Sequence, residues 1–324
     1  MKKLKTTLSL LLLFVTTSVW AQDNCSAIPE LLDRIQTEYI NKKQYNDALI
    51  RLKRLRNHKD LKGCYNLTLV DERIKEVEAL SNSSKMVRDF VVTVNNVSFK
   101  MIYVDDGSFV MGASKEQDMD AEPCEGPIHE VELSSYWIGE TEVTQELWKA
   151  VMGENPSYFD GNSMNPVDNV SWYDCRRFIE KLNDLTASQR PYQLEFRLPS
   201  EEEWEFAARG GKKNMSNQRY AGATTLDGEG WYEGNSSSKT HPVRSKKPNA
   251  LGIYDMSGNV SEWCYDAYRT SYQVKANDKD ATRVLRGGCC VDEAVNCRVT
   301  SRSCGQKGDK NLKNYYYLGL RLSL

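Results

Sequence analysis

The hydrophobic pattern of the chain changes from a helical to an extended period near residue 90. Residues 90–112, FVVTVNNVSFKMIYVDDGSFVMG, alternate apolar and polar positions around Asn-Asn and Asp-Gly turns, which predicts a strand meander. Before them, apolar positions recur three or four residues apart, which predicts short amphipathic helices. These positions are Leu31, Leu32, Ile35, Tyr39, Ala48, Leu49, Leu52, Leu55, Val70, Ile74 and Val77. The pattern predicts a small helical hairpin over residues 22–88 and a larger domain over residues 89–324.

Helices are few but well signalled in the larger domain. Ser171 opens a capping box with Asp174, and the apolar residues that follow fall on one helical face. Ser200 opens a second capping box with Glu203, and Gly210 is expected to end that helix. The long loops around these helices, rich in Gly, Asn, Ser and Asp, need tethering by a metal, a disulfide or buried aromatic side chains. The tryptophans at 137, 148, 172, 204, 231 and 263 are predicted to pack in the core.

The first 21 residues have the pattern of a secretory signal peptide. Three lysines precede an apolar run from Leu8 to Val19, and the run ends in the small-residue cleavage pattern Val19-Trp20-Ala21. The run is shorter than the roughly 20 residues that a spanning helix needs. We therefore expect cleavage before Gln22 and a mature protein that is secreted, periplasmic or in the outer cell envelope, with no transmembrane segment.

Composition indicates a globular protein without affinity for polyanions. The 324 residues are 40% hydrophobic and 10% aromatic, which is sufficient for a core. Lys and Arg (43) nearly balance Asp and Glu (45), so no net field favours nucleic acid or an anionic membrane. We expect no nucleic-acid partner.

All nine cysteines lie in the part expected to be exported, where oxidation is allowed, so most are expected to be paired. Cys25 and Cys64 flank the helical hairpin, and a bridge between them would tie its ends together. Residues 41–55, NKKQYNDALIRLKRL, resemble one tetratricopeptide-type helix pair, but no second copy follows at a fixed period, and such repeats need neighbours.

Seven sequence blocks, in order from about residue 90 to the end, resemble the sulfatase-modifying-factor family, whose best-known member is the formylglycine-generating enzyme. They are GSFVMGA, EGPIHEVELSSYWIGETEVTQELWKAVMG, NPVDNVSWYDCRRFIEKLN, FRLPSEEEWEFAARGG, THPVRSKKPNALGIYDMSGNVSEWC, RVLRGG and GLRL. The resemblance implies a C-type-lectin-like fold of the α/β (α+β) class with little regular secondary structure. This agrees with the long loops expected from composition.

The resemblance also implies oxidase chemistry that this chain departs from. Formylglycine-generating enzymes use two cysteines, five residues apart after the Gly-Gly pair, to bind copper(I) and convert a substrate cysteine to an aldehyde with oxygen. The corresponding positions here are Asp292 and Cys297. A carboxylate is a hard ligand and does not replace a thiolate on copper(I). The family's usual route is therefore expected to be closed, and copper is expected only if the protein is active.

The neighbouring sulfurs leave one alternative open. Cys289 and Cys290 precede Cys297, and because successive side chains of an extended segment point to opposite faces, at most one of them faces it. Cys290 is the alternative catalytic partner of Cys297. We expect instead that Cys297 is buried and bridged, with Cys264 as its partner, although Cys290 or Cys304 would also fit.

The segment YDMSGNVSEW places hard oxygen ligands within eight residues. Asp255, the carbonyls of Gly258 and Val260, and Glu262 are a set that calcium accepts, and the family carries a calcium site in this segment. The resemblance therefore implies a calcium site at these four residues. The alternative is a solvated turn with two unrelated carboxylates.

Other catalytic constellations are missing. The only histidines, His58, His129 and His241, are widely separated and are most simply structural. The sequence has no GxSxG, phosphate-binding glycine loop or HExxH motif. Carboxylates at 201–203 lie in the first turn of a helix, where they favour the positive end of its dipole.

A binding role remains. The segment after Cys304 is polar and ends in Tyr315, Tyr316 and Tyr317, and tyrosines beside small polar residues make adaptable contact surfaces. The alternative is that alternate tyrosines pack in the last strand. The departures from the family gather between residues 289 and 317, as in the variable lectin-fold receptors with a diversified C-terminal loop. We predict a protein or glycan ligand at this C-terminal loop surface and a non-catalytic binding or accessory role. The second hypothesis is an active formylglycine-generating oxidase.

Overall fold

The computed structural model describes residues 27–41, 44–57, 64, 67–83, 87–113, 118–213, 218–274, 282–307 and 315–324. The chain divides into two compact units between Val87 and Arg88, one residue from the predicted boundary. Over the described residues, no helix has both the length and the apolar character needed to cross a membrane. The signal-peptide region and residue 25 lie outside the described residues.

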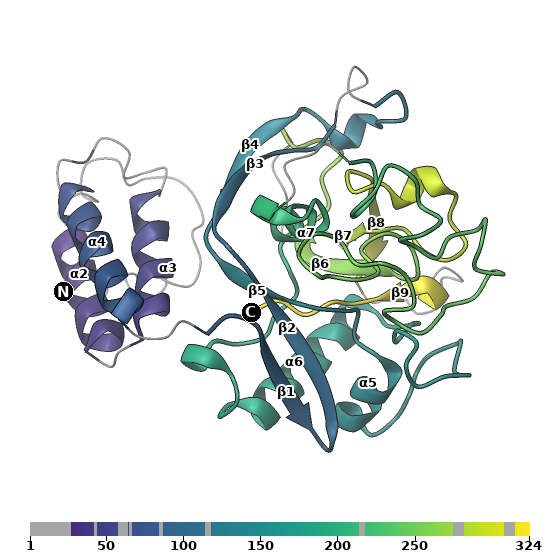
Figure 1. The fold of residues 1–324 in the computed structure, drawn as a ribbon, viewed down its shortest axis with the longest axis horizontal. Coiled ribbons are helices and arrows are strands. Elements are labelled where there is room, and N and C mark those ends of the chain that lie inside the picture. The colour runs from purple at the N-terminus through teal and green to yellow at the C-terminus, as the bar shows by residue number, and fades with distance from the viewer. Residues whose placement is uncertain are drawn as a thin grey trace. The chain divides into compact units, whose positions relative to one another are not determined.

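The described residues of the first unit form three helices where a hairpin was predicted (Figure 1). They are α2 (Ile28–Ile35), which continues as a π-helical turn (Gln36–Ile40), α3 (Tyr45–Arg56) and α4 (Leu67–Ser83). The hairpin prediction was too small because the third apolar run forms a helix of its own. Ile28, Leu52 and Val70 are fully buried where the three helices meet. Cys64 is disulfide-bonded, and since residue 25 is not described, the Cys25–Cys64 pairing stays a prediction.

The second unit is a mixed assembly of short strands and helices, as predicted. Its strands form three sheets, with orders β1-β2-β5, β3-β4 and β8-β7-β6-β9. The strands are β1 (Phe90–Val94), β2 (Val97–Val104), β3 (Gly107–Met111), β4 (His129–Leu133), β5 (Tyr136–Gly139), β6 (Ser261–Ala267), β7 (Thr282–Arg286), β8 (Arg302–Gln306) and β9 (Leu318–Gly319). The predicted Asn-Asn turn joins β1 to β2, and both asparagines have the positive φ that a two-residue hairpin needs.

The helices of the second unit are α5 (Gln145–Met152), α6 (Trp172–Thr186) and α7 (Glu201–Ala208). Single 3-10 turns lie at Pro123–Glu125, Pro191–Gln193, Gly211–Lys213, Ala294–Cys297 and Tyr315–Tyr317. Both predicted capping boxes are present: the hydroxyls of Ser171 and Ser200 accept the amide hydrogens of Asp174 and Glu203. In Figure 1, α5 and α6 pack against β1 and β2, while α7 packs against the sheet that contains β6 and β7.

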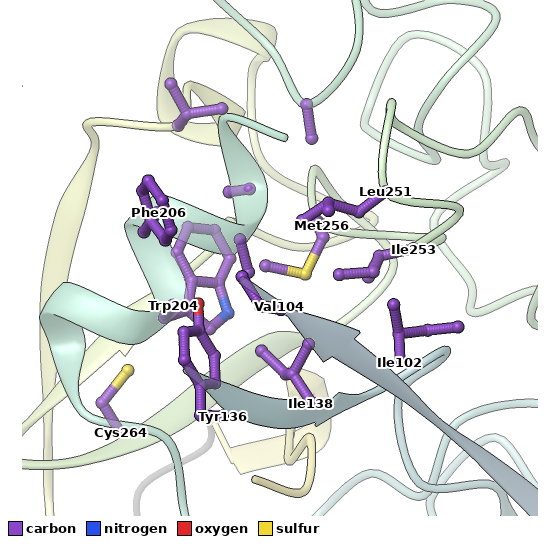
Figure 2. Packing of buried hydrophobic residues seen from close by; sticks show 14 of the residues in the cluster. Ile102, Val104, Tyr136, Ile138, Trp204, Phe206, Leu251, Ile253, Met256 and Cys264 are labelled. Carbon is purple, nitrogen blue, oxygen red and sulfur yellow. The ribbon is translucent and has the colours of Figure 1, made fainter. Parts of the chain in front are cut away.

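The main core is built around Trp204 of α7. Figure 2 shows its indole among Phe206, Tyr136 and Val104, with Met256 nearby. Five of the six tryptophans predicted for the core are buried, whereas Trp231 is half-buried. The segment after β9 pairs with β5, because Leu324 exchanges backbone hydrogen bonds with Trp137 and the Leu322 carbonyl accepts one from Gly139.

Candidate functional site

The loop that follows β7, residues 287–301, carries three buried sulfurs. Cys289, Cys290 and Cys297 are 4%, 0% and 0% exposed. Gly288 has a φ of +66°, and a Cβ at this position would lie 2.8 Å from the Cys297 sulfur. Only glycine fits there, because the backbone is left-handed and passes directly over the thiol. The Gly-Gly pair therefore places Cys297 inside the loop.

Asp292 is part of the loop's own turn. Its carboxylate accepts the amide hydrogen of Cys289 at 2.8 Å, and the Asp292 amide returns a hydrogen bond to the Cys289 carbonyl. Its carbonyl accepts the amide hydrogen of Glu233 at 3.0 Å. Both polar ends of the residue thus stabilise the loop, as expected for an aspartate in a turn. The side chain that replaces the family's first cysteine has taken a structural role.

The thiols of this loop are held in their neutral form. Burial raises the pKa of Cys297, and the negative charge of Asp292 raises it further. Burial likewise raises the pKa of Cys290 to about 12. Since the thiolate is the nucleophile and the metal ligand, a raised pKa disfavours both roles for these sulfurs near neutral pH.

The predicted bridge between Cys264 and Cys297 is wrong in this structure, where both thiols are free. Cys264 belongs to the Trp204 core (Figure 2), whereas Cys297 packs with Tyr220 and Leu226 in a separate cluster. Strand β6 directs one sulfur into the sheet's core, and the 3-10 turn at residues 294–297 directs the other into the loop. The alternative partner Cys290 contributes to the raised pKa of Cys297.

The predicted calcium segment contains one oxygen that suits a cation. Asp255 is 3% exposed, and its Oδ1 has no hydrogen-bond partner among the described residues. Its Oδ2 accepts the amide hydrogen of Arg244 at 2.9 Å. Burial raises the pKa of Asp255 to about 6. Burial and the charges of Asp255 and Glu262 also raise the pKa of Glu142, so these carboxyls repel one another.

Glu262 does not have a free oxygen for calcium. The Arg321 guanidinium donates to both of its oxygens, at 2.6 and 3.0 Å, and the Trp204 indole donates to Oε2 at 2.7 Å. Gly258 and Val260 lie in the turn between Asp255 and Glu262, where the Val260 amide donates to Glu142. Over the described part of the chain, no group of three or more His, Cys, Asp and Glu side chains is arranged to hold a metal. Two of the four predicted ligands are backbone carbonyls, so the calcium site stays a prediction.

An aromatic patch joins the last tyrosines to a loop far away in the sequence. We define it as Tyr158, Phe159, Tyr316 and Tyr317. Tyr158 stacks on Tyr316 with centroids 4.4 Å apart, and Phe159 lies 5.7 Å from Tyr317. Residues 315–317 form a 3-10 turn, so the alternative of alternate packing in a last strand is wrong, since β9 begins only at Leu318. The side chain of Tyr315 lies outside the described residues.

The buried carboxyl group of Asp168 supports the backbone of the aromatic patch. Asp168 is fully buried, and its two oxygens accept the amide hydrogens of Tyr158 and Phe159 at 2.7 and 3.3 Å. Burial raises the pKa of Asp168 to about 7. Tyr158 itself is 59% exposed, so a rigid base presents a large aromatic side chain to solvent.

The aromatic patch lies beside the sulfur loop. Burial raises the pKa of Tyr317, and the neighbouring Cys290 and Cys289 side chains raise it further. Sequence reasoning missed Tyr158, Phe159 and Asp168. Their only signal was two adjacent aromatic residues in a loop of Asn, Pro, Ser and Gly, where no core packing requires them.

The described histidines have structural surroundings. His241 stacks on Trp231 with centroids 3.8 Å apart, and its Nε2 lies 2.7 Å from the Ser236 carbonyl oxygen. His129 Nδ1 lies 3.1 Å from the Pro127 carbonyl oxygen. His58 lies outside the described residues.

Residues 92–322 match the profile of the sulfatase-modifying factor enzyme 1-like domain. A chaperone protein of Paenibacillus barcinonensis is 33% identical over 63% of this chain and 83% of its own length. The formylglycine-generating enzyme of Streptomyces coelicolor is 36% identical over 52% of this chain and 55% of its own length. This chain spans between 36% and 59% of other curated relatives, which are longer proteins.

Among solved structures, Treponema denticola variable protein 1 superposes with a TM-score of 0.64 at 32% identity. The superposition covers 74% of this chain and 99% of the treponemal chain. It runs through nearly the whole of that protein, so the arrangement of strands, long loops and C-terminal segment is shared with it.

Proposed function

The chain belongs to the family of sulfatase-modifying factor enzyme 1-like domains, and from this membership we propose that it is an exported binding or accessory protein of the bacterial cell envelope. It uses the family fold without the family's cysteine oxidation. Its ligand is a protein that contacts the aromatic patch. Export is supported by the basic and apolar pattern of residues 1–21.

The observation that carries this proposal is the position of Asp292. A copper(I) site of the family's kind needs two thiolates directed at one metal. Here one of the two positions is a carboxylate that accepts the Cys289 amide hydrogen, and the remaining Cys297 thiol is buried with a raised pKa. Neither Asp292 nor the protonated Cys297 offers copper(I) a thiolate ligand.

The aromatic patch supports the binding role. Large aromatic side chains on a rigid base give contact area at low entropic cost, and Tyr158 is exposed on such a base. Two similar proteins have names that agree with a binding or accessory role: a chaperone protein and a variable protein. A protein ligand is favoured over a glycan because the chaperone is similar over most of its length.

The oxidase reaction is tested directly. The purified protein is incubated with copper(I), oxygen and a peptide that contains Cys-x-Pro-x-Arg, and the peptide mass is measured. We expect no aldehyde product. An aldehyde product that disappears in Cys297→Ser would overturn the proposal.

The binding role is tested by substituting the exposed end of the patch. A photoreactive group at position 158 is used to cross-link envelope proteins in the native host, and any partner found is then titrated against Tyr158→Ala. We expect at least a tenfold loss of affinity. The control is Val110→Ala on β3, whose side chain is 52% exposed, and it should bind normally. Equal binding by both variants would exclude the aromatic patch as the contact surface.

The active oxidase remains the second candidate, and one observation favours it. Cys290 contributes to the raised pKa of Cys297, so a second thiol lies near the one family cysteine that the resemblance identifies as retained. In that case Cys290→Ser and Cys297→Ser should each abolish aldehyde formation, while Cys289→Ser should retain it.

We propose in addition that calcium supports the fold at Asp255. The ion would meet the unpartnered Oδ1 and relieve its repulsion with Glu142. Saturating calcium should raise the melting temperature, and Asp255→Asn should remove that rise. An unchanged melting temperature for the wild-type protein with and without a chelator would contradict this proposal.

A further inference from the structure

Two accessible cysteines, distant in sequence, share one place at the edge of a sheet. Cys304 lies on β8, the edge strand of the sheet β8-β7-β6-β9, opposite Val284. Cys124 lies in the 3-10 turn Pro123–Glu125. Among the free cysteines in the described part of the chain, Cys304 is exposed and Cys124 is half-buried, whereas the others are buried.

Arg302 fixes the position of Cys124 relative to β8. Its Nη1 donates a hydrogen bond to the Cys124 carbonyl oxygen at 2.5 Å. Side chains two residues apart on a strand point to the same face, so Cys304 projects toward the side from which Arg302 reaches Cys124. On the opposite face, Gly305 packs directly against the Trp263 ring, where a Cβ would lie 2.3 Å from it. Cys304 therefore faces away from the core and toward the Cys124 turn.

Tyr268 is in contact with the same place. Its hydroxyl forms a hydrogen bond with the Cys124 side chain, and the charge of Cys304 also acts on it. The Arg302 guanidinium lies 5.3 Å from the Tyr268 ring centroid. Burial raises the pKa of Cys304, and the next cause is the charge of Cys124. Cys124, Cys304 and the tyrosine hydroxyl thus lie around one arginine.

We propose that Cys124 and Cys304 form an intrachain disulfide when the protein meets a disulfide-bearing oxidant, such as a thiol–disulfide oxidoreductase in its oxidised form or oxidised glutathione. Each cysteine loses its proton and one electron, and the bond between the two Sγ atoms forms. The oxidant's disulfide breaks and leaves as two thiols, which take up the two protons and two electrons. The bond would join the Pro123–Glu125 turn to β8, so that the turn lies against this edge strand.

This inference goes beyond the binding role and does not depend on it. It agrees with export to an oxidising compartment, where accessible thiols are oxidised. The buried thiols of the sulfur loop are not expected to compete, because the oxidant reaches them poorly.

The test is disulfide mapping of the full chain. The protein is reduced, transferred to a buffer of reduced and oxidised glutathione, blocked with an alkylating reagent and digested without reduction. We expect a peptide that links residues 124 and 304. The link should be present in the wild-type protein and in Cys175→Ser, a control at a buried thiol, and absent in Cys124→Ser and Cys304→Ser.

A second measurement reports the effect on stability. Oxidation should raise the melting temperature of the wild-type protein and Cys175→Ser by on the order of 5 °C more than that of Cys304→Ser, because the bond closes a long loop. Glutathione attached to Cys304 without a linked peptide would overturn the proposal. So would a Cys304–Cys304 dimer, or both thiols remaining free in the oxidising buffer.

Discussion

The sheet framework and the sulfur loop of the second unit are both buried, but they are held together by different chemistry. The framework contains paired charges: Arg321 with Glu262 at 2.6 Å, and Arg302 with Glu201 at 2.5 Å, each side chain at most 1% exposed. The sulfur loop contains neutral thiols that pack as small apolar groups.

This difference explains how a residue of the sulfur loop can change without loss of the fold. A buried ion pair requires both partners, because either charge alone in the interior is strongly unfavourable. A buried thiol requires no partner. The framework therefore constrains its residues in pairs, while a residue of the sulfur loop, such as the one at position 292, can change singly.

The largest expected effect on stability comes from removing one partner of a framework ion pair. Arg321→Met should lower the free energy of unfolding by about 3–5 kcal/mol, because the Glu262 carboxylate is left buried without its cation. Urea denaturation followed by tryptophan fluorescence measures this change. Arg88→Met is the control. The Arg88 and Asp105 side chains of this ion pair are 57% and 45% exposed, so the substitution should lower the free energy of unfolding by less than about 1 kcal/mol. Equal losses would remove the distinction between paired and unpaired burial.

The next effect is a dependence of stability on pH. Burial raises the pKa of Asp168 to about 7 and of Asp255 to about 6. The folded state therefore holds these protons more tightly than the unfolded state, so stability rises as pH falls from about 7.5 toward 5. We expect a gain on the order of 1–3 kcal/mol over this range. In Asp168→Asn the gain should shrink, and a wild-type protein that loses stability over the same range would refute the assignment.

A smaller effect is expected in the sulfur loop. Cys297→Ala should lower the free energy of unfolding by only about 1 kcal/mol, because it removes one small buried apolar group and no charge. Thermal and urea unfolding measure this, with Cys175→Ala on α6 as the control at an equally buried thiol. A loss as large as that in Arg321→Met would mean that Cys297 has a bonded partner in the folded protein.

The smallest effect separates the charge of Asp292 from its hydrogen bond. Asp292→Asn keeps an oxygen for the Cys289 amide hydrogen and should change stability by less than about 0.5 kcal/mol. Asp292→Ala loses the acceptor and should cost about 1 kcal/mol. Urea denaturation of the two variants decides, and equal costs would show that the negative charge itself stabilises the loop.

Local features of the fold could be predicted because neighbouring residues cause them. The capping boxes at Ser171 and Ser200 and the turn at Asn95-Asn96 depend on hydrogen bonds or dihedral angles within four residues. The seven family blocks then predicted the rest of the architecture.

The features that were missed all depend on contacts between distant segments. Tyr158 meets Tyr316 only after the chain has folded back, and the amide of Asn259 reaches Glu142 across 117 positions. The bridge from Cys264 to Cys297 failed for the same reason, since spacing alone does not say in which cluster a sulfur packs. The resemblance predicts that residue 292 departs from the family, but the role of Asp292 in the turn needed the coordinates.

The segment from Leu320 to Leu324 has a consequence for how the molecule is made. It supplies hydrogen bonds to β5, and Arg321 reaches the Gly139 carbonyl oxygen across 182 positions. During translation, β5 leaves the ribosome long before this segment exists, so the native sheet edge stays unpaired until synthesis has passed residue 324. Contacts this remote form slowly and leave hydrophobic surface open in the meantime. The nascent chain should therefore depend on chaperones that bind unfolded segments until residues 320–324 have been synthesised.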